Sequence, residues 1–117
     1  MGSDPAFDAE RLRELFGDDE EELVAFLGFA LRSIRTVIEG LASAVARRDG
    51  GTAERLSHEL KGACANAGAR ALAALGQRLE ETVRTNSWAY ADRLVEDAWT
   101  ALDDTASYLA ERTRGER

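Results

Sequence analysis

Apolar residues recur every three or four positions along most of the chain, which is the spacing of helices that bury one face. The longest such run begins at Leu23 and ends at Val45, before the polar and glycine-containing stretch 47–51. Further runs cover residues 12–16, 56–67, 72–83 and 88–109. The pattern therefore predicts five helices and no strand.

Capping residues indicate where these helices begin and end. Asp18, with Glu21 three residues later, resembles a capping box at the start of the long second helix. The other expected boundaries are Asp8 and Gly17 for the first helix, about Thr52 for the start of the third, Gly68 as a point where the pattern continues or restarts, and Asn86 or Ser87 as the cap of the last.

Short connections between amphipathic helices favour antiparallel neighbours. The expected fold is therefore all-α, an antiparallel up-down four-helix bundle with a short additional N-terminal helix laid across one end. We expect residues 7–113 to form this single bundle, residues 1–6 to be a disordered tail or an expression remnant, and residues 114–117 to be a frayed C-terminus. The length of 117 residues fits one domain.

Charge and composition narrow the class of function. The net charge of −7 argues against nucleic acid as a partner, because phosphates attract basic surfaces. No apolar stretch is long enough to span a membrane, and the start lacks a signal sequence, so we expect a cytoplasmic protein. A lone cysteine, Cys64, excludes an internal disulfide and a zinc-type cluster. It lies on an apolar helix side, which predicts a small buried thiol, and no metal site is expected.

The only histidine, His58, lies on the polar side of its predicted helix. Lys61, Gly62 and Ala65 share that side, whereas Leu60 and Cys64 fall on the apolar side. An interior glycine costs a helix roughly 1 kcal/mol relative to alanine, so Gly62 is better explained by keeping space open around the imidazole. A lone helical histidine is more often an ordinary surface residue, and only the combination points to chemistry.

The residues His58-x-x-Lys61-Gly62, followed by Gly68, resemble the signature of the histidine-containing phosphotransfer (HPt) family. The order of a short helix, a long helix, a turn at Asp49 and two further helices resembles that family over nearly the whole chain. Family members take a phosphoryl group from an aspartate of a response-regulator receiver domain onto the histidine and pass it to another receiver. The resemblance implies that His58 is the phosphoacceptor.

The same resemblance implies a phosphocarrier without independent turnover. Its expected partners are receiver domains and a hybrid sensor histidine kinase, and the chain itself is expected to be a monomer without a cofactor. The Mg²⁺ of the reaction would belong to the receiver. A neutral imidazole nitrogen is a good nucleophile near neutral pH, which suits such a carrier.

Each neighbour of His58 has an expected role. Lys61 would offset the charge of the phosphoryl oxygens, Gly62 and Ala65 would leave room for the docking receiver, and Gly68 would be structural. Glu54, one turn before His58, would hydrogen-bond the imidazole, contribute to docking or remain a solvated charge.

The family often places a polar side chain near the phosphohistidine from the following helix. The candidates are Gln77, Glu80, Glu81 and Arg84, and the sequence does not choose among them. Glu80 would repel a phosphoryl group if it stood close, so Arg84 is the expected phosphate-stabilising residue.

Two other classes of function remain as alternatives. A helical adaptor would keep the fold and bind a receiver or kinase without carrying phosphate. A stand-alone enzyme has little support, because the chain has one histidine, no metal-ligand cluster and no nucleotide-binding loop.

Overall fold

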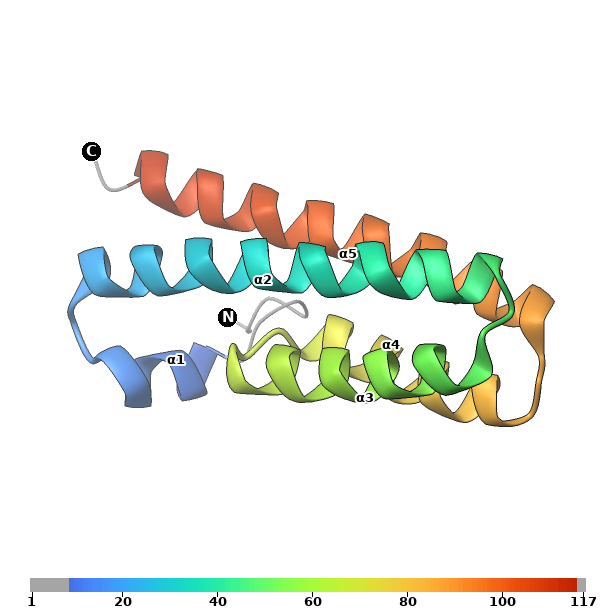
Figure 1. The fold of residues 1–117 in the computed structure, drawn as a ribbon. Coiled ribbons are helices and arrows are strands. Elements are labelled where there is room, and N and C mark those ends of the chain that lie inside the picture. Colours follow the sequence, from blue (N-terminus) through green and yellow to red (C-terminus); the bar gives the residue numbers. More distant parts are fainter. Residues whose placement is uncertain (1–8, 116–117) are drawn as a thin grey trace.

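Figure 1 shows the computed structural model of the chain, which describes residues 9–115 and the side chains of residues 12–111. Every regular element in this part is a helix. The helices are α1 (Ala9–Phe16), α2 (Glu20–Ala46), α3 (Gly50–Asn66), α4 (Arg70–Arg84) and α5 (Trp88–Gly115). The predicted all-α class and the five expected helices are thus confirmed. The expected tail at residues 1–6 lies outside the described residues, and α5 continues two residues past the predicted end of the bundle.

Helices α2 to α5 pack as a ring of neighbours. Contacts join α2 to α3, α3 to α4, α4 to α5, and α5 back to α2. Each helix in Figure 1 runs opposite to the one before it. With 27 and 28 residues, α2 and α5 are much longer than α3 and α4, which have 17 and 15. The molecule is accordingly elongated, with extents of 46 × 22 × 21 Å.

Two groups of buried side chains hold this arrangement together. The larger group fills the space between helices α2 to α5. It includes Ile38, Leu41, Leu60, Leu79 and Leu94, each with no more than 1% exposure. The smaller joins Leu12 of α1 to Leu23 and Leu27 of α2, with Phe16, Phe26, Tyr108 and Leu109 packed around it. Helix α1 therefore packs alongside the first turns of α2, and does not lie across the end of the bundle as predicted (Figure 1).

Aspartates cap the starts of α2 and α3. Asp19 precedes α2 and accepts a hydrogen bond from the backbone N–H of Glu22 at 3.0 Å. The predicted capping box at Asp18 and Glu21 is therefore wrong by one residue. Asp49 caps α3 in the same way, accepting from the N–H of Thr52, so α3 begins at Gly50, before the predicted start.

Three helix ends share one turn. Arg48 after α2, Gly68 after α3 and Asn86 after α4 have positive φ angles of 56°, 76° and 58°. In each turn the next residue's N–H bonds to a carbonyl five residues earlier, as in Asp49 to Ala44. Gly68 therefore marks a restart of the helical pattern, and Ser87 directly precedes α5.

Two further features are the burial of the cysteine and the apolar character of the helices. Cys64 is fully buried, and burial raises the pKa of its thiol to about 12. The predicted burial of the thiol is confirmed. Within residues 9–115 no helix combines the length and apolar character that crossing a bilayer requires.

Candidate functional site

The imidazole of His58 projects from the middle of α3 toward solvent. Its flanking residue Ser57 is buried and donates its hydroxyl to the Ala53 carbonyl, and Leu60 is also buried. Because these side chains fix the inner side of α3, His58 points outward, and 67% of its side chain is exposed. The outward orientation predicted from the helical pattern is what the structure has.

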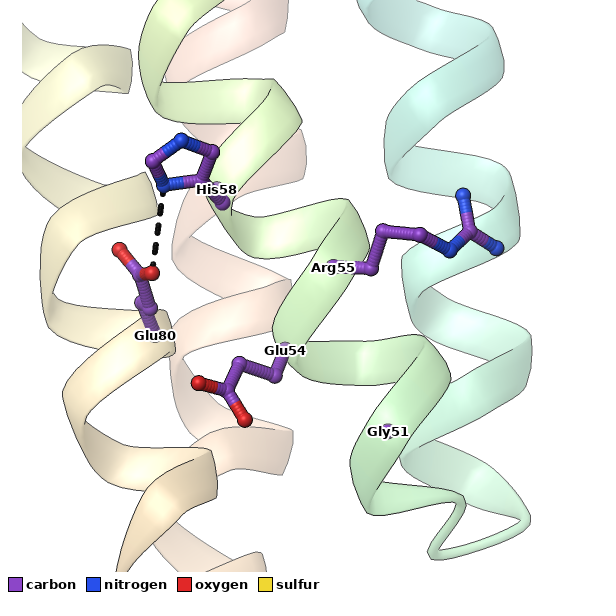
Figure 2. Close-up of a pocket in the computed structure, with 5 residues that line it drawn as sticks. All are labelled: Gly51, Glu54, Arg55, His58 and Glu80. Atoms are coloured by element: carbon purple, nitrogen blue, oxygen red, sulfur yellow. Dashed lines mark hydrogen bonds and ion pairs between the residues drawn. The ribbon is translucent and has the colours of Figure 1, made fainter.

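Glu80 of α4 is the residue that meets the imidazole. Its carboxylate Oε2 lies 3.3 Å from His58 Nδ1, as the dashed line in Figure 2 marks. The same oxygen accepts from Arg84 Nη2 at 3.1 Å, and Oε1 lies 3.4 Å from Lys61 Nζ. The Glu80 side chain is only 7% exposed. The nearly buried carboxylate of Glu80 thus contacts His58 and both predicted cationic site residues, Lys61 and Arg84.

The surroundings keep this carboxylate ionised. Burial raises the pKa of Glu80, whereas its hydrogen bond with Lys61 and the charge of Lys61 lower it. Together with the charges of Arg84 and His58, they bring the pKa of Glu80 below its ordinary value.

A glycine allows α4 to come close enough for this contact. A Cβ atom at Gly76 would lie 2.8 Å from the backbone nitrogen of Lys61 and 3.0 Å from its Cα. Only a residue without a side chain fits such an approach. One turn later, Glu80 is level with His58, while Leu79 and Val83 face the core. The close helix contact at Gly76 therefore positions the carboxylate.

Glu80 also selects the tautomer of the imidazole. An ionised carboxylate only accepts hydrogen bonds, so the ring nitrogen facing it must carry the proton. The lone pair of the neutral ring is then on Nε2, the nitrogen that points away from Glu80 in Figure 2. The arrangement presents an unprotonated, outward-facing nitrogen, which is the form of histidine that attacks an electrophile.

Lys61 and Arg84 lie on either side of this centre and have further partners. Lys61 Nζ donates to Gln77 Oε1 at 2.9 Å, and Gln77 donates to Glu81 at 2.6 Å. Arg84 Nε donates to Glu54 Oε2 at 2.6 Å. Glu54 is therefore connected to the imidazole only indirectly, through Arg84 and Glu80. A direct hydrogen bond from the ring to Glu54 was one of its expected roles, and the structure does not have it.

The surface next to His58 is open on both sides. A hollow of about 320 Å³ is lined by Gly51, Glu54, Arg55, His58 and Glu80 (Figure 2). In the other direction along α3, a Cβ at Gly62 would meet nothing within 4 Å, and Ala65 is exposed. Because residue 62 is a glycine, it places no side chain beside the imidazole of His58.

Sequence reasoning missed one residue of this site and discounted another. No sequence pattern marks Gly76, because its role depends on the approach of α4 to the backbone of Lys61. Glu80 was discounted because its negative charge would oppose phosphate. The missed signal was the spacing of Glu80 and Arg84: four residues apart on one helix, they form an ion pair.

Comparisons with known proteins agree with this geometry. A crystal structure of histidine-containing phosphotransfer protein B (HptB) from Pseudomonas aeruginosa PAO1 has a similar fold, with a TM-score of 0.86 at 23% identity. The similarity covers 98% of this chain and 100% of that one. No curated protein matches the sequence significantly. The model of the Hpt domain family matches residues 11–112, nearly the whole chain, and the chain therefore belongs to the Hpt domain family.

Proposed function

We propose that the chain is a phosphorelay module in which Nε2 of His58 accepts a phosphoryl group from a receiver-domain aspartate and passes it to another receiver. The observation that carries this proposal is the contact between His58 Nδ1 and Glu80 at 3.3 Å on an imidazole that is 67% exposed. It directs the free lone pair outward, where a receiver would approach.

The transfer is a displacement at phosphorus. The Nε2 lone pair attacks the phosphorus of the receiver's acyl phosphate, and the bond from phosphorus to the aspartate oxygen breaks with its electron pair. Catalysis of such a step depends mostly on alignment and charge neutralisation. The Mg²⁺ and the aspartate belong to the receiver, so this chain acts as a phosphocarrier and has no turnover of its own.

Lys61 and Arg84 are the proposed phosphate-stabilising cations. In the unphosphorylated protein both are held by Glu80, within 3.4 Å and 3.1 Å of its two oxygens. Their side chains are 34% and 55% exposed, so their ends are accessible to an incoming phosphoryl group. Charge-assisted hydrogen bonds from such groups stabilise phosphoryl oxygens.

The exposed face of α3 is the proposed docking surface. Gly62 and Ala65 leave it low beside His58, and Glu54 and the hollow border it on the other side. We take the frame behind it to be an antiparallel up-down four-helix bundle with α1 as an additional helix, which the alternating directions of α2 to α5 in Figure 1 support. A monomer presents this face without obstruction.

Intact-mass analysis tests the proposal. The chain is incubated with a panel of phosphorylated receiver domains at neutral or slightly alkaline pH, because phosphohistidine is labile in acid. We expect the gain of one phosphoryl group in the wild type and in the control Glu59→Gln, which alters an exposed residue next to His58. We expect none in His58→Ala.

The result also separates the adaptor alternative. If receivers bind the chain but none transfers a phosphoryl group to it, the chain is an adaptor and the proposed relay is wrong. A phosphoryl group that persists in His58→Ala would likewise contradict His58 as the acceptor.

A further inference from the structure

Arg55 is an exposed cation on α3, about one turn before His58. It forms no hydrogen bond or ion pair with any residue whose side chain the structure describes. Its charge acts at longer range on Asp49, whose pKa it helps to lower. The guanidinium of Arg55 is thus available to a group from another molecule.

The other cations that contact the site around the imidazole are occupied. Lys61 Nζ lies 3.4 Å from Glu80, and Arg84 donates to both Glu54 and Glu80. Lys61 and Arg84 are also the residues proposed to stabilise the phosphoryl group. Among the side chains that line or contact this site in the described part of the chain, Arg55 is therefore the cation left for the partner protein itself.

Arg55 also borders the open hollow beside the histidine. This hollow of about 320 Å³ lies along the first turns of α3, where a Cβ at Gly51 would meet nothing within 4 Å. In Figure 2 the side chain of Arg55 extends on the α2 side of α3, whereas Glu54 and Glu80 lie on the α4 side. A protein that reaches His58 across α3 would meet carboxylates on one side and a guanidinium on the other.

The proposed partner brings negative charge to this face. Transfer to His58 leaves a free aspartate carboxylate on the receiver, and Mg²⁺ is bound by oxygen ligands that include carboxylates. This chain has a net charge of −7, and like charges that face each other across an interface oppose association. A positive side chain on the docking face would offset that repulsion.

We propose that Arg55 is a docking residue that binds a carboxylate at the rim of the receiver's phosphorylation site, on the α2 side of His58. The inference rests on the proposed function and adds to it a residue that favours an acidic partner. The planar guanidinium can bind both oxygens of one carboxylate. Because Arg55 points away from the imidazole in Figure 2, it acts on the affinity and rate of association and not on the displacement at phosphorus.

Glu59 gives the proposal a test of sign. It lies four residues after Arg55 and hence on the same side of α3, and it is exposed. Within the described side chains it has no hydrogen bond or ion pair either. A carboxylate here repels a carboxylate of the partner, so the loss of its charge should have the opposite effect to the loss of Arg55.

The experiment uses a receiver domain that phosphorylates the wild type. The rate of transfer, measured at several receiver concentrations, gives a half-saturating concentration and a maximal rate. We expect Arg55→Ala to raise the half-saturating concentration about fivefold, which is the upper end for an exposed ion pair, and Arg55→Glu to raise it further. Arg55→Lys should lie between the wild type and Arg55→Ala. Glu59→Gln should lower the half-saturating concentration, and all four variants should keep the maximal rate.

Arg93→Glu is the matched control. It makes the same change of charge at an exposed arginine of α5, and within the described residues α5 has no contact with α3. We expect its half-saturating concentration to stay within about twofold of the wild type, because charges beyond about 10 Å are largely screened. Raising the ionic strength from about 0.05 M to about 0.5 M should reduce the effect of Arg55→Glu.

The outcomes distinguish this inference from the proposed function. If Arg55→Glu behaves as Arg93→Glu does, Arg55 is an ordinary solvated charge and the inference is wrong. A lower maximal rate at an unchanged half-saturating concentration would also overturn it, because docking would then be unaffected. If a receiver binds the wild type but transfers no phosphoryl group, the proposed relay fails, and calorimetric titration of the same variants with that receiver still decides the role of Arg55.

Discussion

Two glycines on the α3–α4 side of the molecule have opposite surroundings. A Cβ at Gly76 would lie 2.8 Å from the backbone nitrogen of Lys61, whereas a Cβ at Gly62 would meet nothing within 4 Å. Both lie inside helices, where alanine is intrinsically favoured by roughly 1 kcal/mol. The difference between the two sites is therefore the contact alone.

We expect Gly76→Ala to destabilise the fold by about 1 to 2 kcal/mol, because overpacking against backbone outweighs the gain in helix propensity. The matched control Gly62→Ala should stabilise by about 0.5 to 1 kcal/mol. Urea denaturation of both variants measures these differences. Equal effects of the two substitutions would show that α4 moves away from Lys61 at little cost.

At this scale the sequence predicted the histidine and its neighbours on α3 but not their partner. The outward side of α3 follows from helical periodicity, which fixes which residues share a face. The position of Glu80 depends on how closely α4 approaches α3 and on its rotation. Those are set by Gly76 and by the packing of Leu79, and no pattern within a single helix contains them.

Among the helices, the turns after α2, α3 and α4 repeat one backbone conformation with different residues. Gly68 adopts its positive φ without strain, but Arg48 and Asn86 have side chains there. Arg48 gains from its paired hydrogen bonds to Asp92 at 2.9 and 3.2 Å. Asn86 is uncharged and cannot form such an ion pair, so its tolerance of the conformation comes from asparagine itself, whose short polar side chain is compatible with the left-handed region.

Substitutions at Asn86 test this explanation. We expect Asn86→Ala to lower the free energy of unfolding by about 1 kcal/mol, because alanine resists the left-handed conformation. The free energy of unfolding of Asn86→Gly should be higher than that of the wild type or lower by no more than about 0.5 kcal/mol. Thermal unfolding of the two variants provides the comparison. If alanine is tolerated as well as glycine, this turn does not hold its conformation in solution.

The boundaries of the helices show where local sequence signals are ambiguous. Asp18 and Asp19 are both good caps with a glutamate three residues later. Asp19 is chosen because Gly17, with φ of 58°, ends α1 and the N–H of Asp19 bonds back to the Phe16 carbonyl. The selection is made by the preceding helix, which capping preferences alone do not include.

For the whole molecule, apolar periodicity was sufficient to predict the all-α fold class, but it left open whether the helix of His58 continues through Gly68. It did not predict the place of α1. Helices α3 and α4 are ten to thirteen residues shorter than α2 and α5, which leaves the first turns of α2 without those neighbours. Leu12 covers Leu23 and Leu27 there. The position of α1 thus follows from a difference in helix lengths, which a pattern read one helix at a time does not reveal.

The stability of the whole molecule should decrease in acid. Besides Glu80, the pKa values of Asp49 and Asp92 are lowered, that of Asp49 by its hydrogen bonds with Thr52 and that of Asp92 by its hydrogen bond with Arg48. A carboxyl whose pKa is lower in the folded state stabilises the fold above its unfolded pKa, near pH 4. That stabilisation is lost as the pH falls through the folded value.

Glu80→Gln isolates the contribution of the buried carboxylate. We expect the variant to be less stable than the wild type by about 1 kcal/mol at pH 7, because its hydrogen bonds are no longer charge-assisted. The difference should shrink as the pH falls from about 5 toward 3, since Glu80 itself becomes protonated there. Urea denaturation at several pH values measures both curves. A difference that stays constant in acid would mean that the charge of Glu80 does not contribute to stability. A variant more stable than the wild type at pH 7 would mean that the desolvation cost of the carboxylate exceeds the stabilisation from its contacts with Lys61 and Arg84.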